Sequence, residues 1–330
     1  MMLHSSPSYR SFCLMLLACA ILPGAGCVKD QTTRVLDTAY ARGGKVSVRD
    51  QLGVPSNLVA TLQGGEKLDI LGRRNRWAQV RLTDGRTGWV HSQFLATPAL
   101  FEQFRQLARQ SATVPSQGKA VIRRDANLHV APGTSTETFY RLSENELVEI
   151  FAHQNADRAE RAGSSARPAQ ATPEPPEAVT VNVKGSEDWF LVRASGERVG
   201  WLRESFLDMS PPNEVGRYSE GLRVRAWFVL FEERAGDETH PWYLWATIHP
   251  RAGLPMDYDE IRVFVWNPKM SRYETSYRER NLIGYYPIQV RTVASPGGPQ
   301  PAFSLQLEDP SGKRFQKDYK MIGRSVRSGS

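Results

Sequence analysis

The sequence predicts a mainly β protein: two small closed β-barrels joined by one helix, followed by an antiparallel β-sandwich-like domain. Three observations predict this. Strand-like segments repeat in the first two thirds of the chain, an amphipathic helical segment lies between the two copies, and strand patterns separated by turns follow residue 212. The 330 residues are 40% hydrophobic and 23% charged, which excludes wholesale disorder and suffices for two or three domains.

The N-terminal leader has the three-part plan of a secretory signal. Residues 1–10 are polar with one arginine, Ser11–Leu22 is an apolar run, and small residues precede Cys27. The apolar run has about 12 residues, whereas a membrane-spanning helix needs roughly 20. We therefore predict a signal peptide over residues 1–26 and a tether over residues 27–37.

All cysteines of the chain, Cys13, Cys19 and Cys27, lie in this leader or at its end. A disulfide, a thiolate nucleophile and a cysteine-ligated zinc site are therefore excluded from the mature body. The leader resembles the signal of bacterial lipoproteins, which implies lipidation of Cys27, with Cys19 as the alternative. We expect acyl chains to anchor the protein in the cell envelope, facing the periplasm. The outer membrane is favoured over the inner, because Val28 and not Asp follows Cys27.

A repeat organises the next two hundred residues. An offset of 80 residues places Ser47-Val48-Arg49 on Asn127-Leu128-His129, Leu62 on Leu142, Glu66 on Glu146 and Leu68-Asp69-Ile70 on Val148-Glu149-Ile150. An offset of 112 residues places Trp77 on Trp189, Val80-Arg81 on Val192-Arg193, Gly88-Trp89 on Gly200-Trp201 and Phe94-Leu95 on Phe206-Leu207. We therefore predict barrels over residues 38–97 and 116–209, the second with a disordered insertion at about 155–178 that is rich in Ala, Pro, Glu and Arg.

Each copy has short alternating strands separated by turns, such as Thr83-Asp84-Gly85, a strong hairpin signal. Closure of so small a sheet removes its exposed edges. Gly88 and Gly200 are expected to mark a close approach of two backbones. The segments Val46-Ser47-Val48-Arg49 and Gly88-Trp89-Val90 resemble those of bacterial Src-homology-3-type (SH3b) domains, and the resemblance covers Tyr40–Ala96 and Gly118–Asp208.

The SH3b resemblance directs attention to four candidate ligand-binding residues. Trp89 and Trp201 are candidates to line a peptide or glycan groove by stacking. The alternative is that both complete small cores together with Trp77 and Trp189. Arg49 and His129 occupy equivalent positions, where they are candidates to bind ligand carboxylates or are simply solvated rim residues.

The linker over residues 98–115 has the pattern of an amphipathic helix. Thr97 suits the N-cap and Pro98 the first turn. Its apolar face comprises Leu100, Phe101, Phe104, Leu107 and Ala108. We expect a spacer that packs on the neighbouring barrels, with a partner-binding helix as the alternative.

The pattern of residues 213–330 predicts seven strands in an antiparallel sandwich or open barrel. The strands are Leu222–Phe231, Trp242–Ile248, Ile261–Trp266, Tyr273–Tyr277, Tyr286–Val293, Phe303–Leu307 and Phe315–Tyr319. More than half of the aromatic residues follow Asn213, which predicts a separate core. The stretch Ile261–Arg280 resembles the terminal domain of uncharacterised SH3-type envelope proteins, a resemblance that implies no chemistry.

No catalytic set, metal site or cofactor motif is predicted. His240 and His249 share the last domain and would be the metal ligands of a hydrolase if neighbouring strands brought them together. The sequence Asp257-Tyr258-Asp259-Glu260 lacks the spacing of a calcium loop and is expected to form an acidic, solvent-exposed turn. The net charge of +7 comes without a basic run, so no nucleic acid partner is expected.

We therefore expect a non-catalytic, lipid-anchored envelope protein that binds peptidoglycan peptides or an envelope protein through its SH3-like domains, or that assembles a larger complex. A cell-wall hydrolase with an unrecognised site in the last domain is the alternative.

Overall fold

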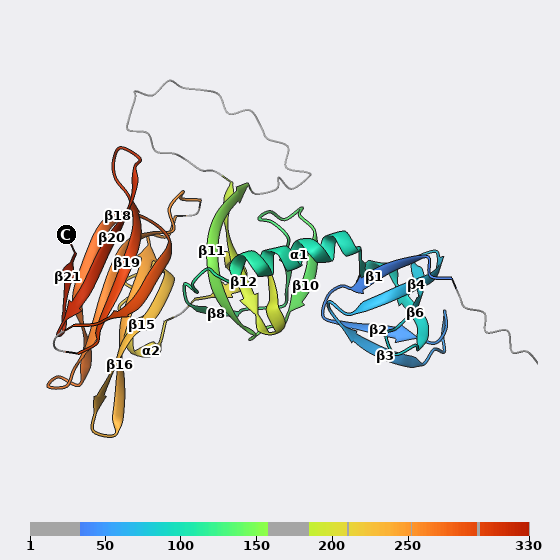
Figure 1. Cartoon of the computed structure of the whole chain (residues 1–330), viewed down its shortest axis with the longest axis horizontal. Helices are drawn as coiled ribbons and strands as arrows, with labels where there is room; N and C mark the ends of the chain where they lie inside the picture. Colours follow the sequence, from blue (N-terminus) through green and yellow to red (C-terminus); the bar gives the residue numbers. More distant parts are fainter. Residues whose placement is uncertain (1–33, 158–184, 210, 252, 296–297, 330) are drawn as a thin grey trace, which may run out of the picture. The chain divides into compact units, whose positions relative to one another are not determined.

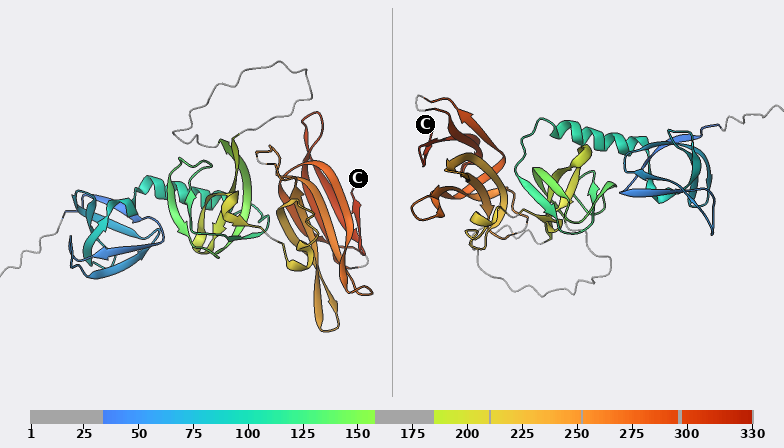
Figure 2. Two further views of the ribbon diagram at one scale, coloured as in Figure 1. Left: turned by 180° about the vertical axis from the view of Figure 1, so that it is seen from behind. Right: turned by 90° about the horizontal axis from the view of Figure 1, so that it is seen from below.

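The computed structural model describes residues 34–157, 185–209, 211–251, 253–295 and 298–329. These contain three antiparallel sheets of seven strands each, which we call the first, second and C-terminal sheets (Figures 1 and 2). The predicted signal peptide, Cys27 and most of the predicted insertion lie outside the described residues. Within the described part, no helix has the length and apolar character needed to cross a membrane.

The first sheet has the strand order β3-β2-β6-β5-β4-β1-β7. Its strands are β1 (Asp37–Ala41), β2 (Lys45–Arg49), β3 (Leu58–Gln63), β4 (Lys67–Arg74), β5 (Trp77–Arg81), β6 (Thr87–His91) and β7 (Leu95–Ala96). Burial alternates along β2, so Val46 and Val48 enter a core of small aliphatic side chains. The β5–β6 hairpin turns at Asp84-Gly85, where Gly85 has a φ of 86° that favours glycine.

The second sheet has the corresponding order β10-β9-β13-β12-β11-β8-β14. Its strands are β8 (Lys119–Ile122), β9 (Ala126–His129), β10 (Thr138–Leu142), β11 (Leu147–Asp157), β12 (Ser186–Ala194), β13 (Arg198–Arg203) and β14 (Leu207–Asp208). The insertion was expected at about 155–178, and β11 runs to Asp157: Asn155 pairs with Asp188 and Asp157 with Ser186 in the β11–β12 ladder. The polar composition of these residues concealed a strand end whose backbone is satisfied by its partner strand.

Both sheets contain the predicted close approach at a glycine. A Cβ at Gly88 would lie 2.6 Å from Val48 Cγ1 and 2.7 Å from the Arg49 carbonyl oxygen. At Gly200 it would lie 2.7 Å from Leu128 Cβ and 3.1 Å from a ring carbon of Phe104. Neither position has room for a side chain.

Helix α1 (Pro98–Ser111) follows the first sheet, and the predicted helix over 98–115 therefore ends four residues early. Thr97 Oγ1 accepts the Leu100 N–H (3.2 Å), and Pro98 begins the helix, as expected. Leu100 and Phe104 are buried in the core of the second sheet, and α1 lies alongside that sheet (Figure 2). The helix thus packs as a spacer against its neighbour.

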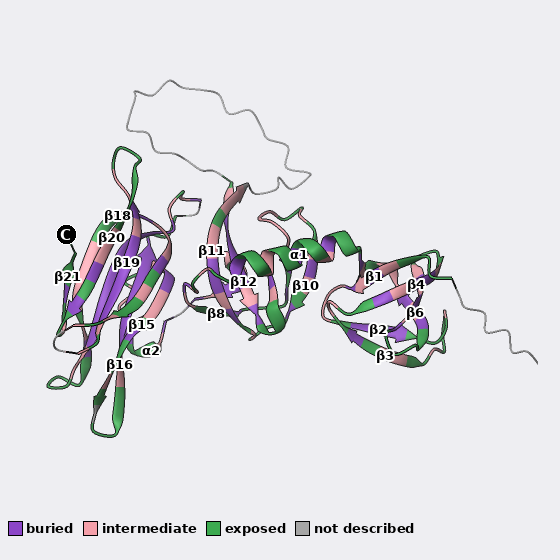
Figure 3. Ribbon diagram, viewed as in Figure 1, coloured by how far each residue is buried: buried purple, intermediate pink, exposed green. Residues whose placement is uncertain are grey.

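The C-terminal sheet follows helix α2 (Asn213–Gly216) and has its strands in chain order. They are β15 (Arg223–Ala235), β16 (Glu238–Ile248), β17 (Tyr258–Asn267), β18 (Arg272–Val293), β19 (Gln300–Glu308), β20 (Arg314–Ile322) and β21 (Ser325–Ser328). All seven strands belong to one sheet, and residues from every strand meet in one core. β18 spans two predicted strands, since its exposed middle hid continuous pairing (Figure 3).

Candidate functional site

The first groove lies beside the loop between β2 and β3. It has a volume of about 530 Å³ and is lined by Arg49, Gln51, Gly53, Val54, Pro55, Ser56 and Trp77. Arg49 donates to the Ser56 carbonyl (3.2 Å) and Gln51 to the Pro55 carbonyl (2.6 Å), which shapes the loop. The Val54 side chain is fully exposed at its tip. The groove therefore combines a solvent-exposed guanidinium, an indole and an apolar tip.

The second groove occupies the corresponding place in the second sheet, with a volume of 340 Å³. Its lining includes His129, Trp189 and Arg203. The rings of His129 and Trp189 meet edge to face at 5.0 Å, and the guanidinium of Arg203 lies 5.8 Å from the Trp189 ring centre. Burial lowers the pKa of His129 and outweighs its hydrogen bond to Thr136. This groove therefore holds a neutral imidazole at pH 7.

The structure places the four predicted ligand residues in two equivalent pairs. Arg49 pairs across strands with Trp89, and His129 with Trp201. Arg49 and His129 line the two grooves, but neither Trp89 nor Trp201 is among the lining residues. Trp89 is half-buried, and Trp201 is buried in a cluster with Trp189.

The tryptophans that line the grooves are Trp77 and Trp189. Both belong to the sequence repeat, because the offset of 112 residues places Trp77 on Trp189. The repeat does not say which of the two tryptophans in a copy faces a groove, because neighbouring strands of a small curved sheet present both on its outer surface.

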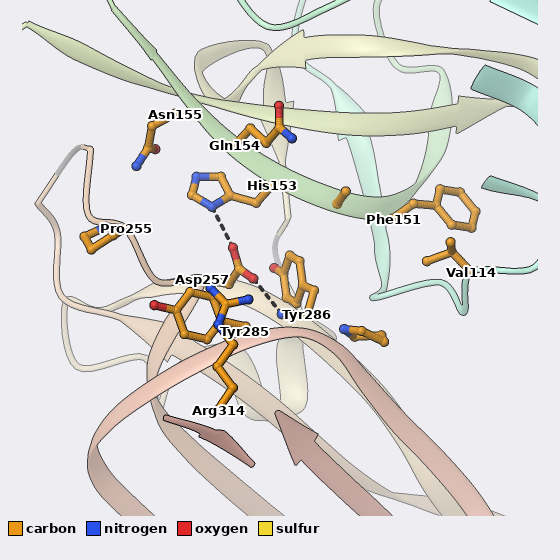
Figure 4. Close-up of a pocket in the computed structure, with 12 residues that line it drawn as sticks. Val114, Phe151, His153, Gln154, Asn155, Pro255, Asp257, Tyr285, Tyr286 and Arg314 are labelled. Carbon is orange, nitrogen blue, oxygen red and sulfur yellow. Dashed lines mark hydrogen bonds and ion pairs between the residues drawn. The ribbon is translucent and has the colours of Figure 1, made fainter. Parts of the chain in front are cut away.

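A third recess, the interface cavity, lies between β11 of the second sheet and the C-terminal sheet (Figure 4). Its volume is 540 Å³, and its lining comes from both sheets: Val114, Phe151, Ala152, His153, Gln154, Asn155, Pro255, Asp257, Tyr285, Tyr286, Pro287 and Arg314. The Arg314 guanidinium lies 3.7 Å from the centre of the Tyr285 ring and covers it.

His153 is the most constrained group of this cavity. Its Nδ1 lies 2.7 Å from Asp257 Oδ1, and its Nε2 lies 3.0 Å from Asp188 Oδ1. Asp257 Oδ2 accepts the Tyr286 N–H at 2.6 Å (Figure 4). Because both ring nitrogens are bonded to carboxylates, His153 has no free lone pair with which to act as a general base.

The pKa shifts of His153 and Asp188 follow from these hydrogen bonds. Burial alone lowers the pKa of His153, but the hydrogen bonds to Asp188 and Asp257 outweigh burial and raise it. Burial alone raises the pKa of Asp188, but the hydrogen bond from His153 and the charge of Arg225 bring it below the ordinary value. Nothing in the sequence pointed to these partners, which lie 35 and 104 residues from His153.

The two histidines considered as metal ligands are far apart. His240 lies near the start of β16 and His249 just beyond its end. Nine residues of one strand span about 30 Å, so the two imidazoles cannot ligate one metal ion. Among the described residues, no group of three or more His, Cys, Asp or Glu side chains is arranged to hold a metal.

The expected acidic, solvent-exposed turn is wrong, because Asp257, Asp259 and Glu260 are buried at the start of β17. Each has a partner: His153 for Asp257, His249 for Asp259 (2.6 Å), and Arg262, Arg278 and Arg280 for Glu260. Paired carboxylates tolerate burial that isolated ones do not. Removing one partner would leave the other charge buried and unpaired.

Comparison with known proteins identifies one domain. Residues 44–96 match the bacterial SH3 domain. No curated protein is similar enough to the chain to count as a match.

Three solved structures show a weak likeness. An NlpC/P60 family protein from Bacillus cereus ATCC 10987 has 10% identity over 52% of this chain and 56% of its own, with a TM-score of 0.24. NlpC2 from Trichomonas vaginalis has 12% identity over 89% of this chain and 98% of its own, with a TM-score of 0.17. NlpC1 from the same organism has 12% identity over 86% and 92%, with a TM-score of 0.18. Such low TM-scores carry no argument about activity.

Proposed function

Since residues 44–96 form a bacterial SH3 domain, we propose that the protein is a non-catalytic binding or scaffold protein of the cell envelope that holds peptidoglycan peptides in the first groove. The observation that carries this proposal is the pairing of Arg49 and Trp77 in an open groove on the matched domain. A guanidinium binds a peptide carboxylate through charge-assisted hydrogen bonds, while an indole contacts apolar atoms.

The proposal extends to the rest of the chain. The second sheet, with its identical strand order, is a second SH3-like barrel whose smaller groove binds a different ligand or none. The leader supports a lipid anchor at Cys27, with the protein facing the periplasm and the outer membrane favoured.

The test is co-sedimentation of the purified full chain with isolated peptidoglycan sacculi at several salt concentrations. We expect retention at low salt that falls as salt rises, because a surface guanidinium–carboxylate contact is screened. Arg49→Ala and Trp77→Ala should each raise the apparent Kd by about 10-fold, the effect of about 1.4 kcal/mol.

Arg73→Ala is the matched control, because Arg73 is an exposed arginine on β4 of the same sheet that does not line the groove. Its variant should bind as the unmodified chain does. If the unmodified chain fails to bind sacculi at low salt, peptidoglycan is excluded and an envelope protein is the partner. If the Arg73 variant loses as much binding as the Arg49 variant, the first groove is not the binding site.

A further inference from the structure

The second sheet and the C-terminal sheet are joined through a buried histidine. The side chain of His153, on β11, is 3% exposed, and that of Asp188, on β12, is 2% exposed. Asp257, from the segment before β17, binds the other ring nitrogen. A neutral imidazole has one N–H and can donate one hydrogen bond, so two carboxylate partners require the doubly protonated ring.

The charges around His153 balance only in that protonated state. The charged and titratable groups that face it are Asp188 from β12, Glu204 from the turn after β13, Arg223 and Arg225 from β15, Asp257 before β17 and Tyr286 from β18. Three carboxylates thus meet two guanidinium groups and one imidazole. A neutral His153 would leave a buried carboxylate without a compensating charge, which is costly.

The remaining bonds across this interface do not titrate near neutral pH. Gln117 Oε1 accepts the Ile288 N–H (2.8 Å), and Asn155 donates to the Leu254 carbonyl (2.6 Å). Arg225, with its side chain 1% exposed, bridges from β15 to Asp188 (3.5 Å). His153 is therefore the group through which pH acts on the contact.

We propose that His153 is a pH-sensitive lock between the second and C-terminal sheets: when protonated it clamps Asp188 to Asp257, and when it loses its proton the contact loosens and the interface cavity opens. This goes beyond the proposed binding function and does not depend on it. The sign follows from linkage. Because folding raises the pKa of His153, its contribution is complete below its unfolded value of about 6.5 and is lost as pH rises through the raised pKa.

The test is hydrogen exchange of the purified full chain at about pH 6 and about pH 9, corrected for intrinsic exchange. The reporters are two amides of β18: that of Ile288, which donates across the interface to Gln117, and that of Tyr286, which donates to Asp257, the carboxylate that His153 binds. Their protection should fall by about 10-fold or more at the higher pH, while amides in the middle of β17 stay protected. His153→Gln should show low protection at both pH values.

Matched variants separate the lock from general stability. His249→Gln removes another His–Asp pair, one that lies within the C-terminal sheet, and should keep the pH response of the unmodified chain. Asp257→Asn weakens the charge that holds the proton, so the loss of protection should begin at lower pH even if His153→Gln does not fold. Protection that is independent of pH, or an Asp257→Asn variant that opens at the same pH as the unmodified chain, would overturn the proposal.

Discussion

The first and second sheets share a strand order but present different outer surfaces. Trp77 is half-buried beside an open groove, whereas its counterpart Trp189 is 2% exposed. Two further outward positions are polar in the first copy and apolar in the second: Gln79 and Thr87 correspond to Leu191 and Val199. The second sheet therefore has an apolar layer on its outside.

Helix α1 covers this apolar layer. Leu107 and Ala108 of α1 pack on the cluster that contains Trp189, Leu191 and Val199. The outer face of the second sheet is covered by the chain's own helix, while the first core contains no helix residue. One topology can thus leave an open groove in one copy and pack against a helix in the other, depending on a few outward side chains.

The largest expected effect tests this division through the tryptophans. Trp189→Ala should destabilise the second sheet by about 3–5 kcal/mol, because it empties a buried site. Trp77→Ala should cost only about 1 kcal/mol, because Trp77 is partly solvated. Urea denaturation followed by circular dichroism measures both. Equal losses for the two variants would show that the two tryptophans are packed alike.

A smaller effect is expected at the glycines where backbones approach. Gly88→Val and Gly200→Val should each cost about 3 kcal/mol, since the new Cβ meets backbone or core atoms. Gly200→Val should also increase proteolysis of α1, because it presses on Phe104. Gly72→Val is the control, as a Cβ there meets only the Gln79 side chain at ordinary contact distance. Unchanged melting of the Gly88 and Gly200 variants would contradict the close approach.

The smallest effect compares the two equivalent groove residues, Arg49 and His129, by how the stability of their variants responds to pH. The pKa of His129 is lowered by burial, so its stabilising neutral form is present above about pH 6.5 and is lost as pH falls below that value. The melting temperature of His129→Gln should therefore fall less than that of the unmodified chain on acidification. Arg49→Gln, which removes no titrating group, should follow the unmodified chain. If the melting temperatures of all three proteins fall in parallel on acidification, the burial of His129 does not affect how stability depends on pH.

Much of the fold was predictable because its signals are local. Alternation at Val46 and Val48, the Asp84-Gly85 turn and the Thr97 cap each depend on neighbouring residues, and the structure contains all three. The correspondence of strand orders was visible as a repeat because equivalent strands need similar inward residues.

The candidate site was less predictable, because it depends on contacts between distant segments. Arg49 and His129 were singled out and do line grooves, but their tryptophan neighbours in the grooves are Trp77 and Trp189. His153 gave no local signal, since an imidazole on a strand acquires its role only from the carboxylates that folding brings to it. The buried acids of β17 looked like a surface turn for the same reason.

The sequence by itself determined a β-rich chain with one capped helix, a duplicated strand pattern and an aromatic terminal unit, because periodicity and turn chemistry act over a few residues. Only the tertiary structure decided which outer face is covered, how the seven last strands join into one sheet, and which acids meet His153. Those outcomes depend on pairings between residues far apart in the chain, where burial and charge compensation are set jointly by both partners.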